Sequence, residues 1–389
     1  MEKVGPQGGY PPFSERMPVF ENYFKPGNVT LEPAIRSYLV DKVRDLLFGS
    51  IRDRRPLAYE SVVKRDIMED KLNTNSGCPS YGKRSDSLIQ QRAIKDAHSG
   101  KWSQYPAILG SRSQRGKDRF IFMFPFSTNL VEKSFLLPLM DIIRSRNVLS
   151  FSAWEGFDDV EIAMDKQNFF KTDTKVSMDY TKMDQHCGED FTLFVYDIIA
   201  PIFQEKYREL LKRSLFHTNN IPIIIGIDKI ASGTHGLASG SGWTNFNESL
   251  FSQAIRFLIE SKLDQKLVGD QGLGDDGAFS LMNRNMNISD VIAESSAQMG
   301  QEANPSKQRV SDNDIVYLQR FFDKDILIKG TNVVAGCYPS ILALNTAMNP
   351  ERFHDARKWN EEMEILRWIM ILENCNHSPY FEQLIEFFI

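Results

Sequence analysis

Two groups of carboxylates in this sequence have the composition and spacing that phosphate chemistry requires. The first lies in the run from Val176 to Asp184, an apolar, strand-like stretch that ends in Asp179 and Asp184. The second is Gly274-Asp275-Asp276-Gly277, with apolar residues on both sides. Carboxylates at strand ends can hold magnesium, which neutralises the charge of a reacting phosphate and activates a hydroxyl nucleophile. The pattern therefore predicts phosphoryl or nucleotidyl transfer.

Each acidic group also has a plainer structural interpretation. An isolated Asp after a strand is commonly a helix cap or a turn residue, and Asp-Gly is a frequent turn pair. Adjacent carboxylates repel each other, however, so a hairpin turn that holds both Asp275 and Asp276 gains from a bound cation. Asp264 and Asp270, just upstream, are interpreted as turn or surface residues rather than metal ligands.

A loop of small residues, 231–245, runs into a long apolar helix. Such loops let backbone amides approach phosphate or sugar oxygens closely, and the helix N-terminus adds a favourable dipole. A flexible surface linker is the alternative. The Thr244-Asn245 pair and the apolar helix that follows favour a fixed loop that feeds the core.

Two basic segments precede the acids. In Arg112–Phe122, residues Arg115, Lys117 and Arg119 alternate along an extended ribbon, so all three can face a triphosphate as a clamp. The segment Asn73–Arg84 is a turn-rich loop that ends in two cations and can grip a template backbone.

Composition is ordinary for a globular protein of 389 residues, with 42% hydrophobic and 25% charged residues, which argues against the disordered and fibrous classes. The net charge of −5 hides an uneven distribution. Nine Lys or Arg stand against three Asp in 83–119, whereas eight Asp or Glu stand against four Lys or Arg in 351–389. A solvated face is the plain interpretation of the basic stretch, and nucleic-acid binding is the functional one.

The N-terminal segment and the cysteines bear on secretion, membrane insertion and metal binding. Met1–Phe20 has scattered Gly and Pro and no apolar core, so it is predicted to be an extended arm rather than a signal peptide or a membrane segment. The four cysteines, Cys78, Cys187, Cys337 and Cys375, show no CxxC spacing. This argues against a zinc cluster or a disulfide scaffold and favours a reducing compartment.

Periodicity predicts one compact α+β unit, with helices packed on one face of a small antiparallel sheet. The predicted helices are Glu32–Phe48, Ser85–His98, Asn129–Arg146, Asp190–Ser214 and Asn245–Lys262, and the predicted strands are Phe120–Phe124, Lys175–Tyr180, Ala278–Met282 and Ile326–Lys329.

Taken in order, these motifs resemble those of the right-handed RNA-dependent RNA polymerases of double-stranded RNA viruses, most closely the picobirnavirus and partitivirus group. The resemblance covers residues 70 to 325. The matching patterns are D-x4-D at Asp179 and Asp184, S-G-x3-T-N at Ser239, Gly240, Thr244 and Asn245, G-D-D at Gly274 to Asp276, S-G-x-P at Ser76, Gly77 and Pro79, and K-x-R at Lys117 and Arg119.

The resemblance implies two catalytic magnesium ions, with manganese as a substitute, held by Asp179 and Asp275 with weaker help from Asp276. Lys307 is implied as the group that protonates the pyrophosphate leaving group. The implied nucleotide contacts are Asp184 and Asn245 for the ribose 2′-hydroxyl, Lys117 and Arg119 for the triphosphate, and Ser239, Gly240 and Thr244 around them. The implied template contacts are Ser76, Gly77, Pro79, Lys83 and Arg84. The sequence departs from many positive-strand relatives at Glu248, where they have Asn.

The resemblance also implies a right-hand architecture of fingers, palm and thumb, with an antiparallel palm sheet flanked by helices. We expect an N-terminal arm and fingers in 1–172, a palm in 173–325 with a fingers insertion at about 191–230, and a small thumb in 326–389. The implied function is copying of viral RNA from ribonucleoside triphosphates, with RNA template and product and a viral capsid protein as partners, in the virion interior and the host cytoplasm.

Two rival functions remain at this point. A reverse transcriptase shares the palm and the two-metal chemistry, but it usually has an aromatic residue before x-Asp-Asp, where this chain has Leu273-Gly274. An RNA-binding structural protein would use the basic stretches for RNA and the acids as turn residues.

Overall fold

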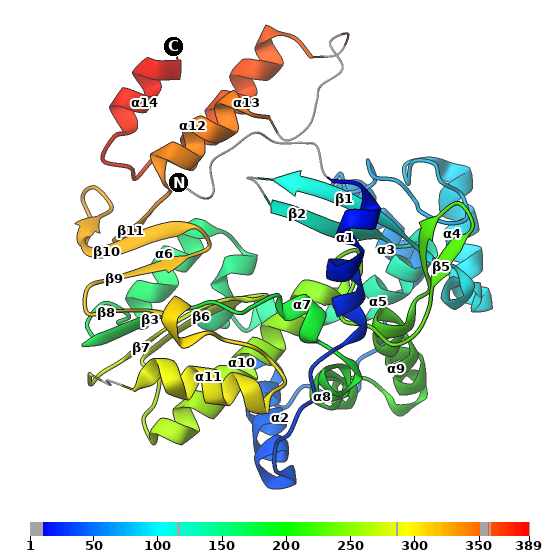
Figure 1. The fold of residues 1–389 in the computed structure, drawn as a ribbon, viewed down its shortest axis with the longest axis horizontal. Coiled ribbons are helices and arrows are strands. Elements are labelled where there is room, and N and C mark those ends of the chain that lie inside the picture. The colour runs from blue at the N-terminus through cyan, green and yellow to red at the C-terminus, as the bar shows by residue number, and fades with distance from the viewer. Residues whose placement is uncertain (1–10, 115–116, 285–286, 351–356, 358, 389) are drawn as a thin grey trace.

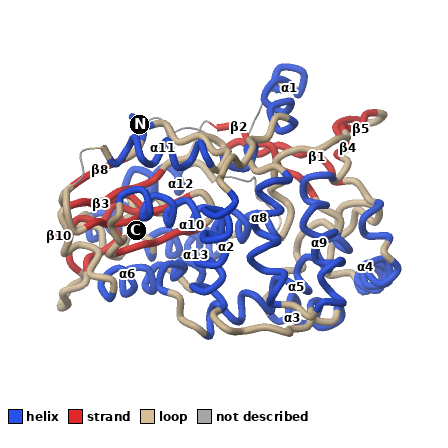
Figure 2. Tube along the Cα trace, turned by 90° about the horizontal axis from the view of Figure 1, so that it is seen from below, coloured by secondary structure: helices blue, strands red, loops and turns tan. Residues whose placement is uncertain are grey.

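The computed structural model describes residues 11–114, 117–284, 287–350, 357 and 359–388. Their strands form three sheets with the orders β2-β1-β4-β5, β6-β7-β3-β8 and β11-β10-β9. Figure 1 shows the second and third sheets at one side of the molecule and the first sheet at the other, and Figure 2 shows long helices running between them. The predicted α+β class is confirmed.

The sheet that carries the acids is antiparallel throughout. Its strands are β3 (Thr174–Met178), β6 (Gly269–Leu273), β7 (Asp276–Leu281) and β8 (Arg309–Ser311). All five residues of β3 are buried, because β3 lies in the middle of the sheet and is covered by neighbouring elements. This sheet corresponds to the antiparallel sheet that was predicted for the palm.

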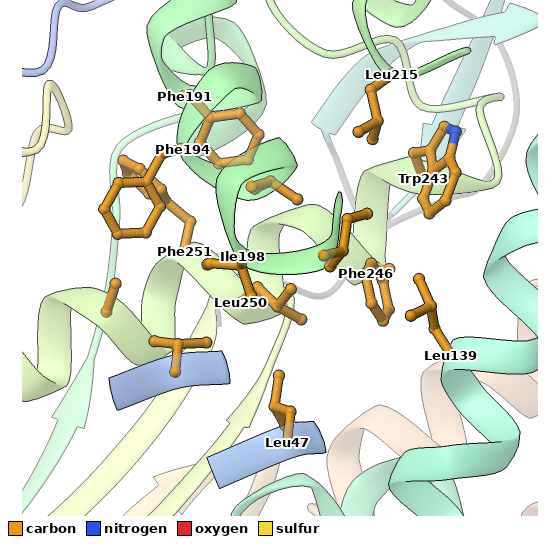
Figure 3. Close-up of a cluster of buried hydrophobic side chains, with 14 of the residues drawn as sticks. Leu47, Leu139, Phe191, Phe194, Ile198, Leu215, Trp243, Phe246, Leu250 and Phe251 are labelled. Carbon is orange, nitrogen blue, oxygen red and sulfur yellow. The ribbon is translucent and has the colours of Figure 1, made fainter. Parts of the chain in front are cut away.

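The helix α10 (Trp243–Leu263) is the central element of the core. It packs against β6 and against two further helices, α2 (Pro33–Phe48) and α8 (Glu189–Ile199). Figure 3 shows Phe191 and Phe194 from α8 against Phe251 from α10. Its buried residues include apolar side chains such as Leu250 and Ile255 and also polar ones such as Gln253 and Arg256, so α10 is buried along most of its length.

The prediction of one helix over Asp190–Ser214 is wrong. The chain forms α8, then a short 3-10 turn at Ala200–Ile202, and then a second helix, α9 (Glu205–Asn220). Pro201 lies in the turn, and proline lacks the N–H that a continuing helix would need. Apolar periodicity continues across the break because both helices face the same core.

The sheet at the other side joins distant parts of the chain. The strands β1 (Ala107–Gln114) and β2 (Lys117–Met123) form an antiparallel pair, and β4 (Ile223–Gly226) adds to β1 in parallel, with β5 (Lys229–Ala231) at the edge. Three helices from the same part of the sequence pack against one another. They are α3 (Tyr59–Met68), α4 (Ser87–Ser99) and α5 (Phe126–Ser145).

The predicted extended arm is wrong for the part that the structure describes. Residues Phe13–Glu21 form the helix α1, and a 3-10 turn follows at Asn22–Phe24. Phe13 and Phe20 both contact Phe120 of β2 edge-to-face, with ring centroids 6.0 and 5.7 Å apart. Aromatic packing on the sheet therefore stabilises a helix that the scattered Gly and Pro did not suggest. Residues 1–10 lie outside the described residues.

The remaining elements follow the acids. The helix α11 (Ile288–Gln298) packs on α10, and α6 (Phe157–Lys166) packs near β6 and β11. The third sheet consists of β9 (Asp314–Tyr317), β10 (Arg320–Leu327) and β11 (Val334–Cys337). The helices α12 (Ser340–Met348), α13 (Glu361–Glu373) and α14 (Phe381–Phe388) lie beyond this sheet at one end of the molecule (Figure 1).

The predicted domain limits stay a prediction. The limit at 172/173 falls just before β3, and the limit at 325/326 falls within β10. Among the described residues, none of the helices has both the length and the apolar character that a membrane span needs.

Candidate active site

The strand register brings Asp179 and Asp275 to the same end of one sheet. Met178, the last residue of β3, pairs with Gly277 of β7, so Asp179 follows directly beside the start of β7. Leu273 pairs with Asp276, which leaves Gly274 and Asp275 as a two-residue hairpin turn. Gly274 has φ +61°, a conformation that this kind of turn requires and that glycine adopts without strain. Two carboxylates that are far apart in the sequence thus become neighbours.

Several charged side chains act on one another at this end of the sheet. The pKa of Asp275 is raised, first by removal of its carboxyl group from water and then by the negative charges of Asp184 and Asp179. Arg119 acts in the opposite direction on the pKa of both Asp275 and Asp184. The acids and one clamp residue, predicted separately from the sequence, therefore face a common space.

The donor atoms in this space suit a hard divalent cation. Carboxylate oxygens are the ligands that magnesium prefers, and a cation would relieve the repulsion that raises the pKa of Asp275. Across the described parts of the chain, no group of three or more His, Cys, Asp or Glu side chains is placed to hold a metal by itself. Magnesium sites often use one or two carboxylates together with substrate phosphates, so these residues fit such a site.

Asp276 faces a different environment from Asp275. It lines a cavity of about 290 Å³ together with Leu273, Phe157, Leu318 and Gln319. Its charge also acts on Tyr317 of β9, whose pKa is raised mainly by burial. The predicted metal role of Asp276 stays a prediction.

Asp184 is held by a residue that sequence reasoning missed. It lies on the short helix α7 (Met183–His186), and its carboxylate accepts a hydrogen bond from the hydroxyl of Tyr23. Burial raises the pKa of Asp184, while the bond from Tyr23 and the charge of Arg119 lower it. No motif marked Tyr23, because its role arises only when the N-terminal segment packs on the sheet.

The small-residue loop is fixed, as its sequence context predicted. A buried carboxylate, Glu132, accepts bonds from the Ser241 hydroxyl at 2.6 Å and from the Gly242 N–H at 2.8 Å. The Thr244 hydroxyl donates to the Ala238 carbonyl at 2.8 Å. These bonds hold the loop where α10 begins.

Two other residues of this motif face outward or lie against a strand. Ser239 is exposed. Gly240 lies so close to β2 that an added Cβ would be 1.6 Å from the Phe122 carbonyl oxygen.

The first turns of α10 connect the loop to the hairpin turn. The Asn245 side-chain oxygen accepts from the Trp154 indole N–H at 3.1 Å, and the Ser249 hydroxyl accepts from the Gly274 N–H at 2.7 Å. Glu248 is buried nearby, and its pKa is raised well above 4.5 by burial and by the charges of Asp275 and Asp184. The sequence marked Glu248 only as a departure from related motifs, and it now joins the candidate site.

The structure describes only some residues of the predicted basic clamp, which comprises Arg115, Lys117 and Arg119. The strands β1 and β2 pair Arg112 with Arg119 and Gln114 with Lys117, as an extended ribbon requires. Arg119 is exposed and acts on the acids. Arg115 and the side chain of Lys117 lie outside the described part of the structure.

The predicted template loop is built around its own hydrogen bonds. Arg84 donates to the Asn129 side-chain oxygen at 2.8 Å and lies 5.0 Å from the Phe126 ring, and burial lowers its pKa. The carbonyl of the buried Ser76 accepts from the Phe126 N–H at 2.8 Å.

Other residues of this loop are placed differently. Gly77 has φ +64°, and an added Cβ would lie 2.7 Å from the Phe124 carbonyl oxygen. Pro79 is half-buried, and Lys83 is exposed. Arg84 thus anchors the loop to α5, and template binding by Ser76, Gly77, Pro79, Lys83 and Arg84 stays a prediction.

The interpretation of Asp270 as a turn or surface residue is wrong. Asp270 lies in β6, is buried, and accepts hydrogen bonds from the side chains of Arg256 and Gln253 on α10. Asp264 is exposed at the C-terminal end of α10, as predicted.

The fold and the site together define a class of protein. An antiparallel sheet presents two acids at one end, the small-residue loop and α10 lie beside them, and Arg119 of the basic ribbon acts on them electrostatically. This is the arrangement of a right-hand polymerase, and the predicted architecture is confirmed.

Comparisons with known proteins identify the particular relatives. The chain is 28% identical to a potential RNA-dependent RNA polymerase of human picobirnavirus, over 100% of this chain and 74% of the relative. Two crystal structures of a human picobirnavirus RNA-dependent RNA polymerase match all of this chain. An insertion-loop deletion mutant has a TM-score of 0.82 at 24% identity, with 78% of that chain covered, and a second structure has 0.81 at 25%, with 75% covered. No family model matches the sequence.

The predicted resemblance to picobirnavirus polymerases is therefore confirmed. The expected enzyme class, a nucleotidyltransferase of the RNA-directed RNA polymerase type, is confirmed with it.

Proposed function

We propose that this chain extends an RNA strand on an RNA template, by two-metal nucleotidyl transfer from ribonucleoside triphosphates, to replicate and transcribe viral RNA. The observation that carries the proposal is the strand register that brings Asp179 and Asp275 to one end of the sheet. Burial there, and after it the charges of Asp184 and Asp179, raise the pKa of Asp275. This end of the sheet gathers negative charge, which makes it suited to cations and to the phosphates that accompany them.

Magnesium, or manganese in its place, would be held by Asp179 and Asp275, with Asp276 as a weaker partner. When bound, it would supply charge neutralisation at the phosphate and activation of the attacking hydroxyl. The residues of the chain orient the substrate around this point. Arg119, with Lys117, would bind the triphosphate, and Lys307 would donate a proton to the leaving group.

Selection of a ribonucleotide needs hydrogen-bonding groups near the 2′-hydroxyl. Asp184 and Asn245 are proposed for this role, with Ser239, Gly240 and Thr244 shaping the loop beside them. Glu248 lies one helical turn after Asn245 and acts electrostatically with Asp184 and Asp275, which supports adding it to this group.

The proposed partners follow from the same chemistry and from the resemblance. RNA template, RNA product and nucleoside triphosphates are the reactants. Association with a viral capsid protein, and a location in the virion interior and the host cytoplasm, are proposed from the resemblance to polymerases of double-stranded RNA viruses.

An incorporation assay with matched nucleotides and templates tests the proposal. Purified protein is incubated with labelled ribonucleotides or deoxyribonucleotides, on RNA or DNA templates, with magnesium or with EDTA. We expect ribonucleotide incorporation on RNA that EDTA abolishes. Preferential incorporation of deoxyribonucleotides would identify a reverse transcriptase instead. RNA binding without incorporation, unaffected by EDTA or by Asp179→Asn, would identify an RNA-binding structural protein.

A further inference from the structure

The backbone ladder between β3 and β8 ends before it reaches Asp179. The paired residues are Lys175 with Ser311, Val176 with Val310 and Ser177 with Arg309. Continuing this register would place Lys307 opposite Asp179, but Lys307 lies in the 3-10 turn Pro305–Lys307, where its N–H donates to the Asn304 carbonyl at 3.0 Å. The backbone of Asp179 therefore needs other partners on this side.

The side chain of Gln308 supplies those partners. Its Nε2 donates to the Asp179 carbonyl at 2.8 Å, and its Oε1 accepts from the Asp179 N–H at 3.1 Å. A carboxamide carries the same donor and acceptor groups as a peptide unit, so it can extend a strand ladder by one residue. Backbone pairing returns two residues later, where the Thr181 N–H donates to the Glu302 carbonyl at 2.8 Å.

The same side chain is joined to the turn that carries Lys307. The Nε2 of Gln308 also donates to the Asn304 carbonyl at 3.1 Å. The Asn304 side-chain oxygen in turn accepts from the Ser306 N–H at 3.0 Å and the Ser306 hydroxyl at 2.9 Å. Lys307 thus lies on a short turn whose first residues are held by the Asn304 side chain, and Gln308 follows it directly. Gln308 itself is buried, at 8% exposure, so water competes little for these bonds.

We propose that Gln308 is a positioning residue that holds the backbone of Asp179 and the Lys307 turn at a fixed separation. This inference rests on the proposed function, in which Asp179 and Lys307 act on the same triphosphate. Gln308 acts through Asp179 and has no role in contacting the substrate. Because a misplacement of about 1 Å can cost about a hundredfold in rate, its loss affects turnover more than nucleotide affinity.

The chain contains a matched control at the opposite edge of the same sheet. The Nε2 of Gln167 donates to the Asp270 carbonyl at 3.1 Å, and its Oε1 accepts from the Asp270 N–H at 3.4 Å. Gln167 therefore bonds to a strand backbone in the same way as Gln308, but at β6 rather than beside Asp179. A purely structural effect should appear equally in both variants.

The experiment compares Gln308→Met with Gln167→Met in the full chain, because methionine keeps the length and removes the hydrogen bonds. Hydrogen exchange of peptides that contain Asp179 and Lys307 is the first readout and needs no activity. We expect exchange there to accelerate about tenfold in Gln308→Met and to stay at the wild-type rate in Gln167→Met. Single-nucleotide addition is the second readout. We expect kcat to fall about a hundredfold in Gln308→Met, with the nucleotide KM within about threefold.

A second variant, Gln308→Glu, tests the same proposal if Gln308→Met fails to fold. Gln308→Glu retains an oxygen that can accept from the Asp179 N–H and loses the donor, so both readouts should change in the same direction. Wild-type exchange at Asp179 in a folded Gln308 variant, or an equal loss of kcat in Gln167→Met, overturns the proposal. If wild-type protein incorporates no nucleotide, the proposed function fails, and the exchange readout still decides whether Gln308 holds Asp179.

Discussion

At the scale of single residues, Arg256 and Asp270 form an ion pair that is buried in the core. The Arg256 side chain has no exposure to solvent, and it donates to Asp270 and, at 2.8 Å, to the Ser252 hydroxyl. Removing one partner of such a pair leaves a buried charge without compensation, which costs more than the pair itself contributes.

The first prediction follows from this pair. Asp270→Asn should lower the free energy of unfolding by about 3–5 kcal/mol, because the Arg256 charge stays buried without its counter-charge. Urea unfolding followed by circular dichroism measures the change. The control is Asp264→Asn at the exposed end of α10, which should stay within about 0.5 kcal/mol of wild type. Equal effects of the two substitutions would contradict the structural role of Asp270.

A second prediction concerns Glu248, whose pKa in the folded protein is raised well above 4.5. Between pH 4.5 and that raised value, the folded protein keeps a proton that the unfolded chain releases. The free energy of unfolding therefore falls as pH rises through this window. The stability that the protonated Glu248 side chain contributes is fully present below the window and is lost above it. Glu248→Gln removes this dependence.

The stability of Glu248→Gln relative to wild type should therefore grow with pH, by up to about 1.4 kcal/mol per pH unit within the window. Urea unfolding at a series of pH values, in EDTA, measures the difference. Glu382→Gln, at an exposed position of α14, should follow the wild-type profile. Parallel profiles for wild type and Glu248→Gln would show that Glu248 has no such linkage.

Sequence reasoning at this scale found the residues that belong to short motifs and missed those that act through tertiary contacts. Asp179 and Asp275 were found because acids at strand ends have a recognisable context. Tyr23 and Gln308 were not found, because nothing near them in the sequence shows that Tyr23 reaches Asp184 or that Gln308 reaches the backbone of Asp179.

At the scale of elements, the loop before α10 is placed by its contact with β2. Gly240 lies against the Phe122 carbonyl, where a Cβ would have no space, and Glu132 holds the next two residues. The position of this loop therefore depends on the strand that carries Arg119.

The third prediction tests that contact. Gly240→Ala forces the loop away from β2 and should lower the free energy of unfolding by about 1–3 kcal/mol. Gly226→Ala in β4 is the control, because its Cβ would make an ordinary contact at 3.7 Å and should change stability by less than about 0.5 kcal/mol. Thermal unfolding of both variants gives the comparison. A Gly240→Ala protein as stable as Gly226→Ala would show that the loop is not held by β2.

Elements with strong local signals were predictable, and elements defined by their partners were not. The strand before Asp179, the hairpin at Gly274 and the helix α10 all follow from apolar periodicity and turn residues. The helix break at Pro201 was concealed because α8 and α9 face one core. The helix α1 forms on a surface of Phe120 and neighbouring aromatic residues that local periodicity cannot reveal.

At the scale of the whole molecule, the order of the motifs predicted the architecture better than any single motif did. Each motif alone is compatible with a turn, a linker or a solvated face. The fold brings β3, β7 and the start of α10 together at one end of the sheet, where the two acidic motifs and the loop before α10 can act jointly. The placement of α12–α14 had no comparable sequence signal.

The central claim is that Asp179 and Asp275 serve one reaction, and incorporation of labelled ribonucleotides by alanine variants tests it most directly. Asp179→Ala and Asp275→Ala should each reduce incorporation by at least about a thousandfold while urea unfolding shows a folded protein. Asp264→Ala, which changes an exposed acid outside the site, should retain wild-type incorporation. Incorporation that survives in a folded Asp179→Ala or Asp275→Ala protein would contradict the account.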